Sequence, residues 1–80
     1  MRLFWVYYMK EVPITTEFIK VQDLLKFASL VSTGGEAKIV ISEGEVEVNG
    51  ETCMQRGRKL RPGDVVRYRG QELTVGYADH

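Results

Sequence analysis

Apolar residues recur every three or four positions between residues 21 and 31, which is the spacing of one buried face on an α-helix. The same spacing returns over residues 35–43, where Ala37, Val40 and Ile41 form the apolar face. Because only Ser32, Thr33 and Gly34 separate the two segments, the pattern predicts two helices joined by a very short, glycine-containing turn.

The start and the end of the second predicted helix carry their own signals. Thr33, followed three residues later by Glu36, is typical of a capping box. In that arrangement the hydroxyl and the carboxylate accept hydrogen bonds from backbone amides that the helix leaves free. Gly44 supplies the left-handed residue with which helices commonly end.

Beyond Gly44 the apolar period changes from 3.6 to 2, which indicates strands. Asn49-Gly50 is the strongest short signal for a hairpin turn, and Pro62 and Gly63 occupy positions that a second β-turn favours. Helices followed by strands define an α+β fold, here with two short helices and a small antiparallel sheet. The expected strands are residues 45–48, 52–54, 65–69 and 72–75.

The beginning of the chain is expected to form an extended N-terminal arm or strand. Residues 3–9 are apolar and rich in aromatic and β-branched side chains, which suits an extended segment. They are far fewer than the ~20 residues that span a membrane. Pro13 pushes the residue before it out of the helical conformation. We therefore expect an arm over residues 1–17, a domain over 18–76, a tail over 77–80, and no membrane contact.

Reactive residues are few. The 80 residues of the chain suffice for one domain. The single cysteine, Cys53, excludes an internal disulfide and suits a buried strand position. The single histidine, His80, leaves no histidine-based catalytic or metal site. We therefore expect a cytoplasmic binding protein that is not an enzyme, with no cofactor, no metal and no small-molecule substrate.

Positive and negative charges fall in separate segments, although the formal net charge is zero. Residues 36–51 contain five glutamates and one lysine, whereas residues 52–70 contain six basic residues and one acid. Four of these cations lie within the basic segment, residues 56–61, where they repel one another unless an anion lies between them. The pattern predicts a basic patch that attracts phosphates. The alternative is a pair of solvated faces of opposite sign.

Together these features resemble the RNA-binding domain named after small-subunit ribosomal protein S-four, also called the αL motif, over residues 18–75. The family pattern Ser-Arg-x-x-Ala-Arg/Lys is matched by Thr-Gly-Gly-Glu-Ala-Lys at 33–38, and Ile-x-x-Gly-x-Val-x-Val-Asn-Gly by residues 41–50. The Pro-Gly-Asp turn of the family is matched by residues 62–64. Gly34 stands where the family has an arginine that contacts phosphate. The diglycine and the basic segment look like the small stand-alone branch of YaaA- and YbcJ-type proteins.

The resemblance implies a stand-alone, monomeric RNA-binding protein. It would recognise the phosphates and shape of structured RNA, ribosomal or transfer RNA, rather than a base sequence. The diglycine amides are expected to approach a phosphate directly. Phe18, Trp5 and the tyrosines could stack on bases, although we expect most of them in the core. The expected RNA-binding residues are Lys20, Lys26, Thr33, Gly34, Gly35, Lys38, Arg56, Arg58, Lys59 and Arg61.

The same residues also allow other interpretations. Gly34 and Gly35 can serve only to form a tight corner between the helices, and the basic segment can be an ordinary solvated loop. A different function, protein–protein interaction without RNA, would use the acidic hairpin over residues 43–51 or the apolar N-terminal arm.

Overall fold

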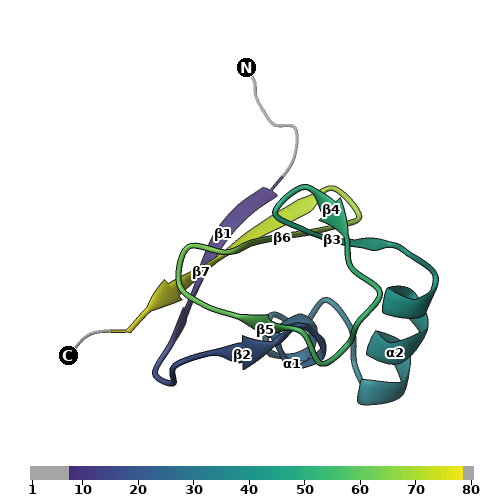
Figure 1. Ribbon diagram of the computed structural model, residues 1–80, viewed down its shortest axis with the longest axis horizontal. Helices are drawn as coiled ribbons and strands as arrows, with labels where there is room; N and C mark the ends of the chain where they lie inside the picture. The colour runs from purple at the N-terminus through teal and green to yellow at the C-terminus, as the bar shows by residue number, and fades with distance from the viewer. Residues whose placement is uncertain (1–7, 79–80) are drawn as a thin grey trace.

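Two helices lie against one sheet along residues 8–78, the part of the chain that the computed structural model describes (Figure 1). The elements are β1 (Tyr8–Ile14), β2 (Ile19–Lys20), α1 (Val21–Phe27), α2 (Gly34–Ser42), β3 (Val46–Val48), β4 (Glu51–Thr52), β5 (Lys59–Leu60), β6 (Val65–Tyr68) and β7 (Gln71–Tyr77). Five strands form a sheet in the order β1-β7-β6-β3-β4, and β2 pairs with β5 in a separate two-stranded ribbon. The α+β fold predicted from the sequence is confirmed.

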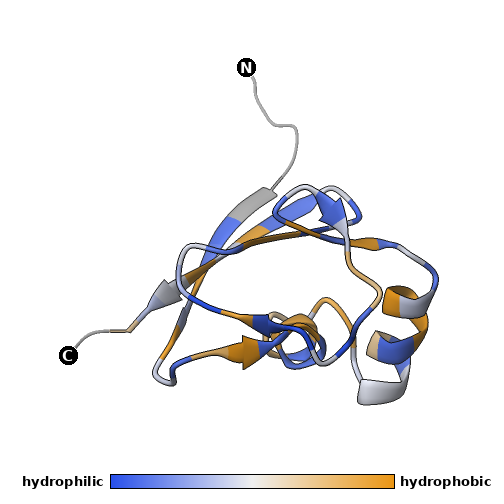
Figure 2. Ribbon diagram, in the orientation of Figure 1, coloured by the Kyte–Doolittle hydropathy of each residue, from blue (hydrophilic) through white to orange (hydrophobic). Residues whose placement is uncertain are grey.

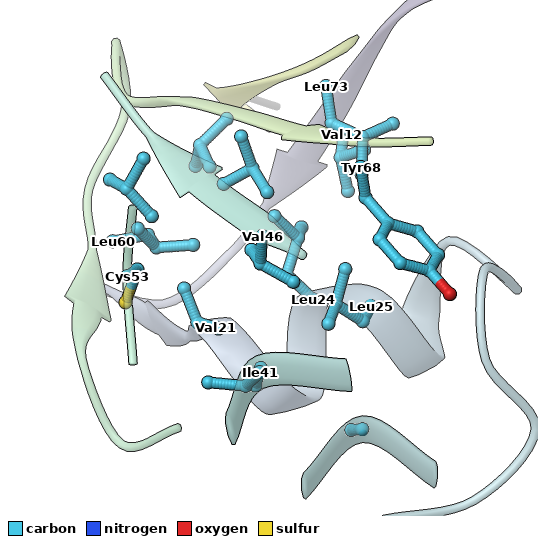
Figure 3. Packing of buried hydrophobic residues seen from close by; sticks show 14 of the residues in the cluster. Val12, Val21, Leu24, Leu25, Ile41, Val46, Cys53, Leu60, Tyr68 and Leu73 are labelled. Carbon is cyan, nitrogen blue, oxygen red and sulfur yellow. The ribbon is translucent and has the colours of Figure 1, made fainter. Parts of the chain in front are cut away.

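The core lies between the helices and the sheet face that looks toward them (Figure 3). Leu24 of α1 and Ile41 of α2 pack there against strand residues such as Val46, and each has an exposed fraction of 1% or less. Leu60 brings the ribbon into the same cluster, and the predicted buried position of Cys53 is confirmed. Figure 2 shows the complementary pattern, with hydrophilic residues where the chain approaches β5 from β4.

The strands predicted after the helices pair antiparallel as expected, and the predicted arm adds a parallel strand that makes the sheet mixed. β1 runs parallel to β7, in the register Val12 opposite Val75, whereas the other pairs in this sheet are antiparallel. Val12 and Ile14 are buried in the common core. The second half of the predicted arm is therefore an edge strand of the sheet. The apolar residues before Tyr8, including Trp5, lie outside the described residues.

Pro13 fits into β1 because of the side to which its nitrogen points. The carbonyl of Ile14 accepts a hydrogen bond of 2.9 Å from the amide of Ala78, so the backbone groups of Ile14 face β7. Successive residues of a strand direct these groups to opposite sides. The nitrogen of Pro13 therefore faces the open edge of the sheet, where a missing N–H costs no ladder hydrogen bond.

The first helix ends earlier than predicted. α1 stops at Phe27, and Ser29 has a left-handed backbone with φ of 62°. The apolar pattern misled because it continues through the turn: Val31 is only 5% exposed although it lies outside the helix. Its amide donates a hydrogen bond of 3.3 Å to the carbonyl of Leu25. The chain thus buries the end of the apolar stripe without extending the helix.

The predicted capping signals of α2 are confirmed, with one change of partner. The amide of Glu36 donates to the hydroxyl of Thr33 at 3.1 Å. The carboxylate of Glu36 accepts from the amide of Ser32 at 2.8 Å, one residue before the expected amide of Thr33. Gly44 follows the helix with φ of 74°, in the left-handed region that glycine favours.

The two predicted turns are joined by a hydrogen-bond network. The carboxylate of Asp64 accepts from the side-chain amide of Asn49 at 3.1 Å and from the backbone amide of Arg61 at 2.8 Å. The carbonyl oxygen of the Asn49 side chain accepts from the amide of Val65 at 2.9 Å. Burial raises the pKa of Asp64, but these hydrogen bonds and the charges of Arg58 and Arg61 outweigh it and lower the pKa overall.

We predict that Asp64→Asn destabilises the protein at neutral pH and less so at pH 3. Asn offers one oxygen in place of two, so one hydrogen bond worth about 0.5–1.5 kcal/mol is lost. A carboxyl whose pKa is lowered by folding stabilises the protein above its unfolded pKa of about 3.9, and this contribution disappears as the pH falls through the lowered value. Urea unfolding at pH 7 and pH 3 measures the difference. An equal loss at both pH values would contradict the role of the charged carboxylate.

Candidate nucleic-acid interface

The first half of the basic segment is held against the start of α1 by backbone hydrogen bonds. The amide of Val21 donates to the carbonyl of Arg58 at 2.9 Å, and the amide of Gln22 donates to the carbonyl of Arg56 at 3.2 Å. Lys20, the N-cap residue, makes no side-chain capping bond. The loop therefore caps α1 with main-chain carbonyls, and the side chains of Arg56 and Arg58 need not take part in that capping.

The second half of the basic segment lies on the β2–β5 ribbon. Ile19 pairs with Leu60, and Lys20 pairs with Lys59. Leu60 is fully buried and Ile19 packs partly against the core. Because side chains alternate across a strand, the residues next to them face outward. We call this outward surface the ribbon face; it comprises Phe18, Lys20, Lys59 and Arg61.

Positive charges crowd on the ribbon face. Lys20 lies directly opposite Lys59, an arrangement of like charges that destabilises a strand pair. The ammonium of Lys59 is 4.8 Å from the centroid of the Phe18 ring, and the guanidinium carbon of Arg61 is 5.8 Å from it. Cation–π contacts at exposed sites are weak, about 0.5–1 kcal/mol each, so they offset this repulsion only in part.

Glutamates pair with the two arginines of residues 52–70 that lie outside the basic segment. Arg67 forms an ion pair of 3.9 Å with Glu47, and Arg69 forms one of 3.4 Å with Glu45, because β3 lies beside β6. The acidic residues 36–51 and the basic residues 52–70 therefore do not lie on separate faces, because two ion pairs join them. Within residues 8–78, no ion pair of 4.0 Å or less joins the basic segment to an acid. Asp64 is near enough only to feel the charges of Arg58 and Arg61.

The remaining predicted residues gather at the corner between α1 and α2, the end of α1 away from the basic segment. A Cβ atom built on Gly34 would lie 3.9 Å from the ammonium of Lys26, which reaches the first turn of α2. Lys26 also forms a 3.6 Å ion pair with Asp23. Lys38 is exposed on α2, one helical turn beyond Gly34. The hydroxyl of Thr33 is engaged as the helix cap.

The structure thus brings the predicted residues together as two groups rather than one. Arg56, Arg58 and the ribbon face lie at the start of α1, and the corner lies at its end. A seven-residue helix is about 10 Å long, so the groups are separated by roughly that distance along the axis. Figure 1 shows the ribbon and α1 next to each other, with α2 beyond them. Phe18 is absent from the predicted contact set. The alternation of side chains next to Ile19 places it on the ribbon face with Lys20, Lys59 and Arg61.

Two grooves elsewhere on the surface do not suit phosphates. One, of about 240 Å³, is lined by uncharged residues, among them Ile14, Ile19 and Phe27. The other, of about 400 Å³, holds Arg67 between Glu47 and Glu72 and is net negative. Within the described residues, no group of three or more His, Cys, Asp or Glu side chains could hold a metal ion. No helix among residues 8–78 is long and apolar enough to cross a membrane.

The fold and the cations that have no ion pair within residues 8–78 define a small module with a basic patch suited to nucleic-acid phosphates. The chain belongs to the S4 domain family, whose model matches residues 12–76. The family resemblance inferred from the sequence is thereby confirmed, and with it the class of RNA-binding protein. The chain is 48% identical over 59 residues to the probable ribosome maturation protein RlbA of Bacillus subtilis, covering 74% of this chain and 83% of that protein.

A second relative is known both as a sequence and as a structure. The putative RNA-binding protein YbcJ of Escherichia coli is 33% identical over 57 residues, covering 71% of this chain and 81% of YbcJ. Its solution structure, described as revealing an αL motif involved in RNA binding, matches with a TM-score of 0.63 and 25% identity over 95% of each chain. The 30S ribosomal protein S4e of Thermoplasma acidophilum shares the fold, with a TM-score of 0.62 and 23% identity over 81% of this chain and 34% of S4e.

Neither glycine of the corner is required by the local geometry. Gly34 and Gly35 lie in α2 and have no left-handed backbone, and a Cβ atom on either would meet only ordinary contacts at 3.8–3.9 Å. A tight corner therefore does not explain the diglycine. What the missing side chains do provide is open access to the first amides of α2.

We predict that Gly34→Ala and Gly35→Ala leave the fold intact and raise its stability by up to about 0.5–1 kcal/mol, because alanine has less backbone freedom to lose. Thermal unfolding measures the change. Gly44→Ala is the matched control, since its left-handed backbone makes that substitution destabilising. Destabilisation by the two corner substitutions would assign the diglycine a structural role.

Proposed function

We propose that this protein is a stand-alone module that binds structured RNA through phosphates and shape. The observation that carries the proposal is the set of cations around the start of α1, which have no ion pair within the described residues. Lys20 and Lys59 oppose each other there without an acid between them. The formal net charge is zero, so these charges are not part of a generally basic surface. A polyanion would relieve their repulsion.

RNA is the polyanion favoured by the family and by the shape of the surface. Arginine presents a planar fork that matches phosphate, and the basic segment contains three arginines. The exposed ribbon and helix corner form a surface rather than a deep pocket, which suits the backbone of a folded RNA. The name of YbcJ supports RNA, and that of RlbA supports a ribosomal target. We propose binding without catalysis, by a cytoplasmic monomer, with ribosomal or transfer RNA as the partner.

The two groups would divide the contact between them. Arg56, Arg58 and the ribbon face would bind phosphates at the start of α1. At the other end, the open amides of Gly34 and Gly35 would donate hydrogen bonds to a phosphate, with Lys26 and Lys38 beside it. Gly34 replaces the family arginine, and we propose that the basic segment compensates for that lost contact.

The alternative of a protein-binding acidic hairpin is weaker than the sequence suggested. Glu45 and Glu47 face Arg69 and Arg67, so part of the acidic charge of the hairpin is neutralised within the sheet.

Two pairs of arginines allow a matched test of the phosphate mechanism. Arg58→Gln with Arg61→Gln should weaken binding to a synthetic RNA stem-loop and reduce the slope of log affinity against log salt by about 0.7–0.9 for each lost phosphate contact. Arg67→Gln with Arg69→Gln removes the same charge from ion-paired positions and should change the affinity little. Fluorescence anisotropy over a salt series gives both quantities.

The outcomes separate the hypotheses. Equal weakening by both pairs would mean that only net charge matters, and no effect of the first pair would remove the basic segment from the interface. A DNA stem-loop of the same sequence should bind the unchanged protein more weakly, because it lacks the A-form backbone and the 2′-hydroxyls. Absence of RNA binding at low salt would overturn the proposed function itself.

The corner is tested separately by the alanine variants at its glycines. Gly34→Ala and Gly35→Ala should lower the affinity for the same RNA stem-loop, because a methyl group obstructs the approach of a phosphate to the first amides of α2. The expected gain in stability excludes unfolding as the cause. Unchanged affinity in both variants would remove the diglycine from the interface and leave the basic segment as the phosphate site.

A further inference from the structure

Phe18 is half-buried on the ribbon face and is not part of the hydrophobic core. Its neighbour Ile19 packs against the core, whereas Phe18 belongs neither to the buried cluster nor to the side chains packed against it. The contacts found for its ring are with Lys59 and Arg61. The hydroxyl of Thr16 donates to the carbonyl of Phe18 at 2.8 Å, which fixes the backbone where it enters the ribbon. The ring is thus held at the surface among cations.

An aromatic ring surrounded by cations matches the two parts of a nucleotide. A base has a flat face that stacks on an aromatic side chain, and the phosphate next to it binds lysine or arginine. Cation–π contacts alone explain the position poorly, because they are weak where water competes. Within a duplex each base is already stacked on both sides, so only an unpaired base is free to stack on Phe18.

We infer that Phe18 is a stacking platform for an unpaired base of the bound RNA, with Lys59 and Arg61 on the adjoining phosphates. The ammonium of Lys59 lies over the ring in this structure and would move to a phosphate when a base takes its place. The inference rests on the proposed RNA-binding function and adds a preference that phosphate contacts cannot give. The protein should favour a stem that carries an unpaired nucleotide over a stem whose bases are all paired.

The test compares two RNAs that differ in one base only. Both are the same stem with a single unpaired nucleotide, which in one of them is an abasic ribose that keeps its phosphate. The full-length protein should bind the intact RNA about tenfold more tightly, as expected for one base stacked on an aromatic side chain. Phe18→Leu should abolish this difference, whereas Phe18→Tyr, which keeps the ring, should retain it. Thermal unfolding of each variant verifies that it is folded.

Each result has one meaning for Phe18. Equal affinity of the unchanged protein for both RNAs would overturn the stacking role while leaving RNA binding intact. If Phe18→Leu weakens binding to both RNAs equally, Phe18 only positions the two cations, and the inference is wrong. If the unchanged protein binds neither RNA at low salt, the proposed function fails first. Should Phe18→Leu not fold, the comparison of the two RNAs with the unchanged protein and with Phe18→Tyr still decides the question.

Discussion

The amides at the start of α1 are the constraint around which the basic surface is arranged. No side chain of the N-cap residue satisfies them, and the carbonyls of Arg56 and Arg58 do so instead. A buried or half-buried amide without a partner costs about 1–3 kcal/mol, so these two bonds hold the loop firmly to the helix. Because the main chain provides the attachment, the guanidinium groups of the same residues are not needed for folding. In the proposed interface, folding and RNA binding therefore use different atoms of one segment.

The other end of the ribbon is fixed in a comparable way. Asp64 and Asn49 join the turn after β5 to the hairpin turn between β3 and β4, and their bonds include the amide of Arg61. The pKa of Asp64 is lowered partly by Arg58 and Arg61, so this carboxylate also tempers the positive potential. It makes no ion pair of 4.0 Å or less with either arginine. Lys20 and Lys59, opposite each other in β2 and β5, form no ion pair within residues 8–78.

Signals within a few residues of one another could be read from the sequence. The capping box at Thr33, the left-handed Gly44 and the Asn49-Gly50 hairpin are each determined by local chemistry, and the structure has them all. The parallel pairing of β1 with β7 could not be predicted, because it joins the two ends of the described chain and has no local signature. The early end of α1 was missed since buried apolar residues continue into the turn.

The candidate site was predictable in its residues but not in its arrangement. The clustered arginines can be read from the sequence. The capping of α1 by backbone carbonyls cannot, because it does not depend on which side chains those residues carry. Only the β3–β6 register shows that Arg67 and Arg69 meet glutamates while the basic segment does not. The register of β2 with β5 likewise shows that Phe18 lies next to Lys59 on the ribbon face, which the sequence alone does not reveal.

The positions of the cations around α1 suggest why Gly34 can stand where the family has an arginine. A side chain at the start of α2 would deliver its charge from the corner, whereas here the nearest cation is Lys26, already paired with Asp23. Cations without an ion pair lie instead at the opposite end of α1, on a loop that backbone hydrogen bonds attach to the helix. A loop attached by carbonyls tolerates changes in its side chains more readily than a helix start, at which each side chain also affects capping. The number and spacing of cations can therefore vary on this loop while the fold stays the same.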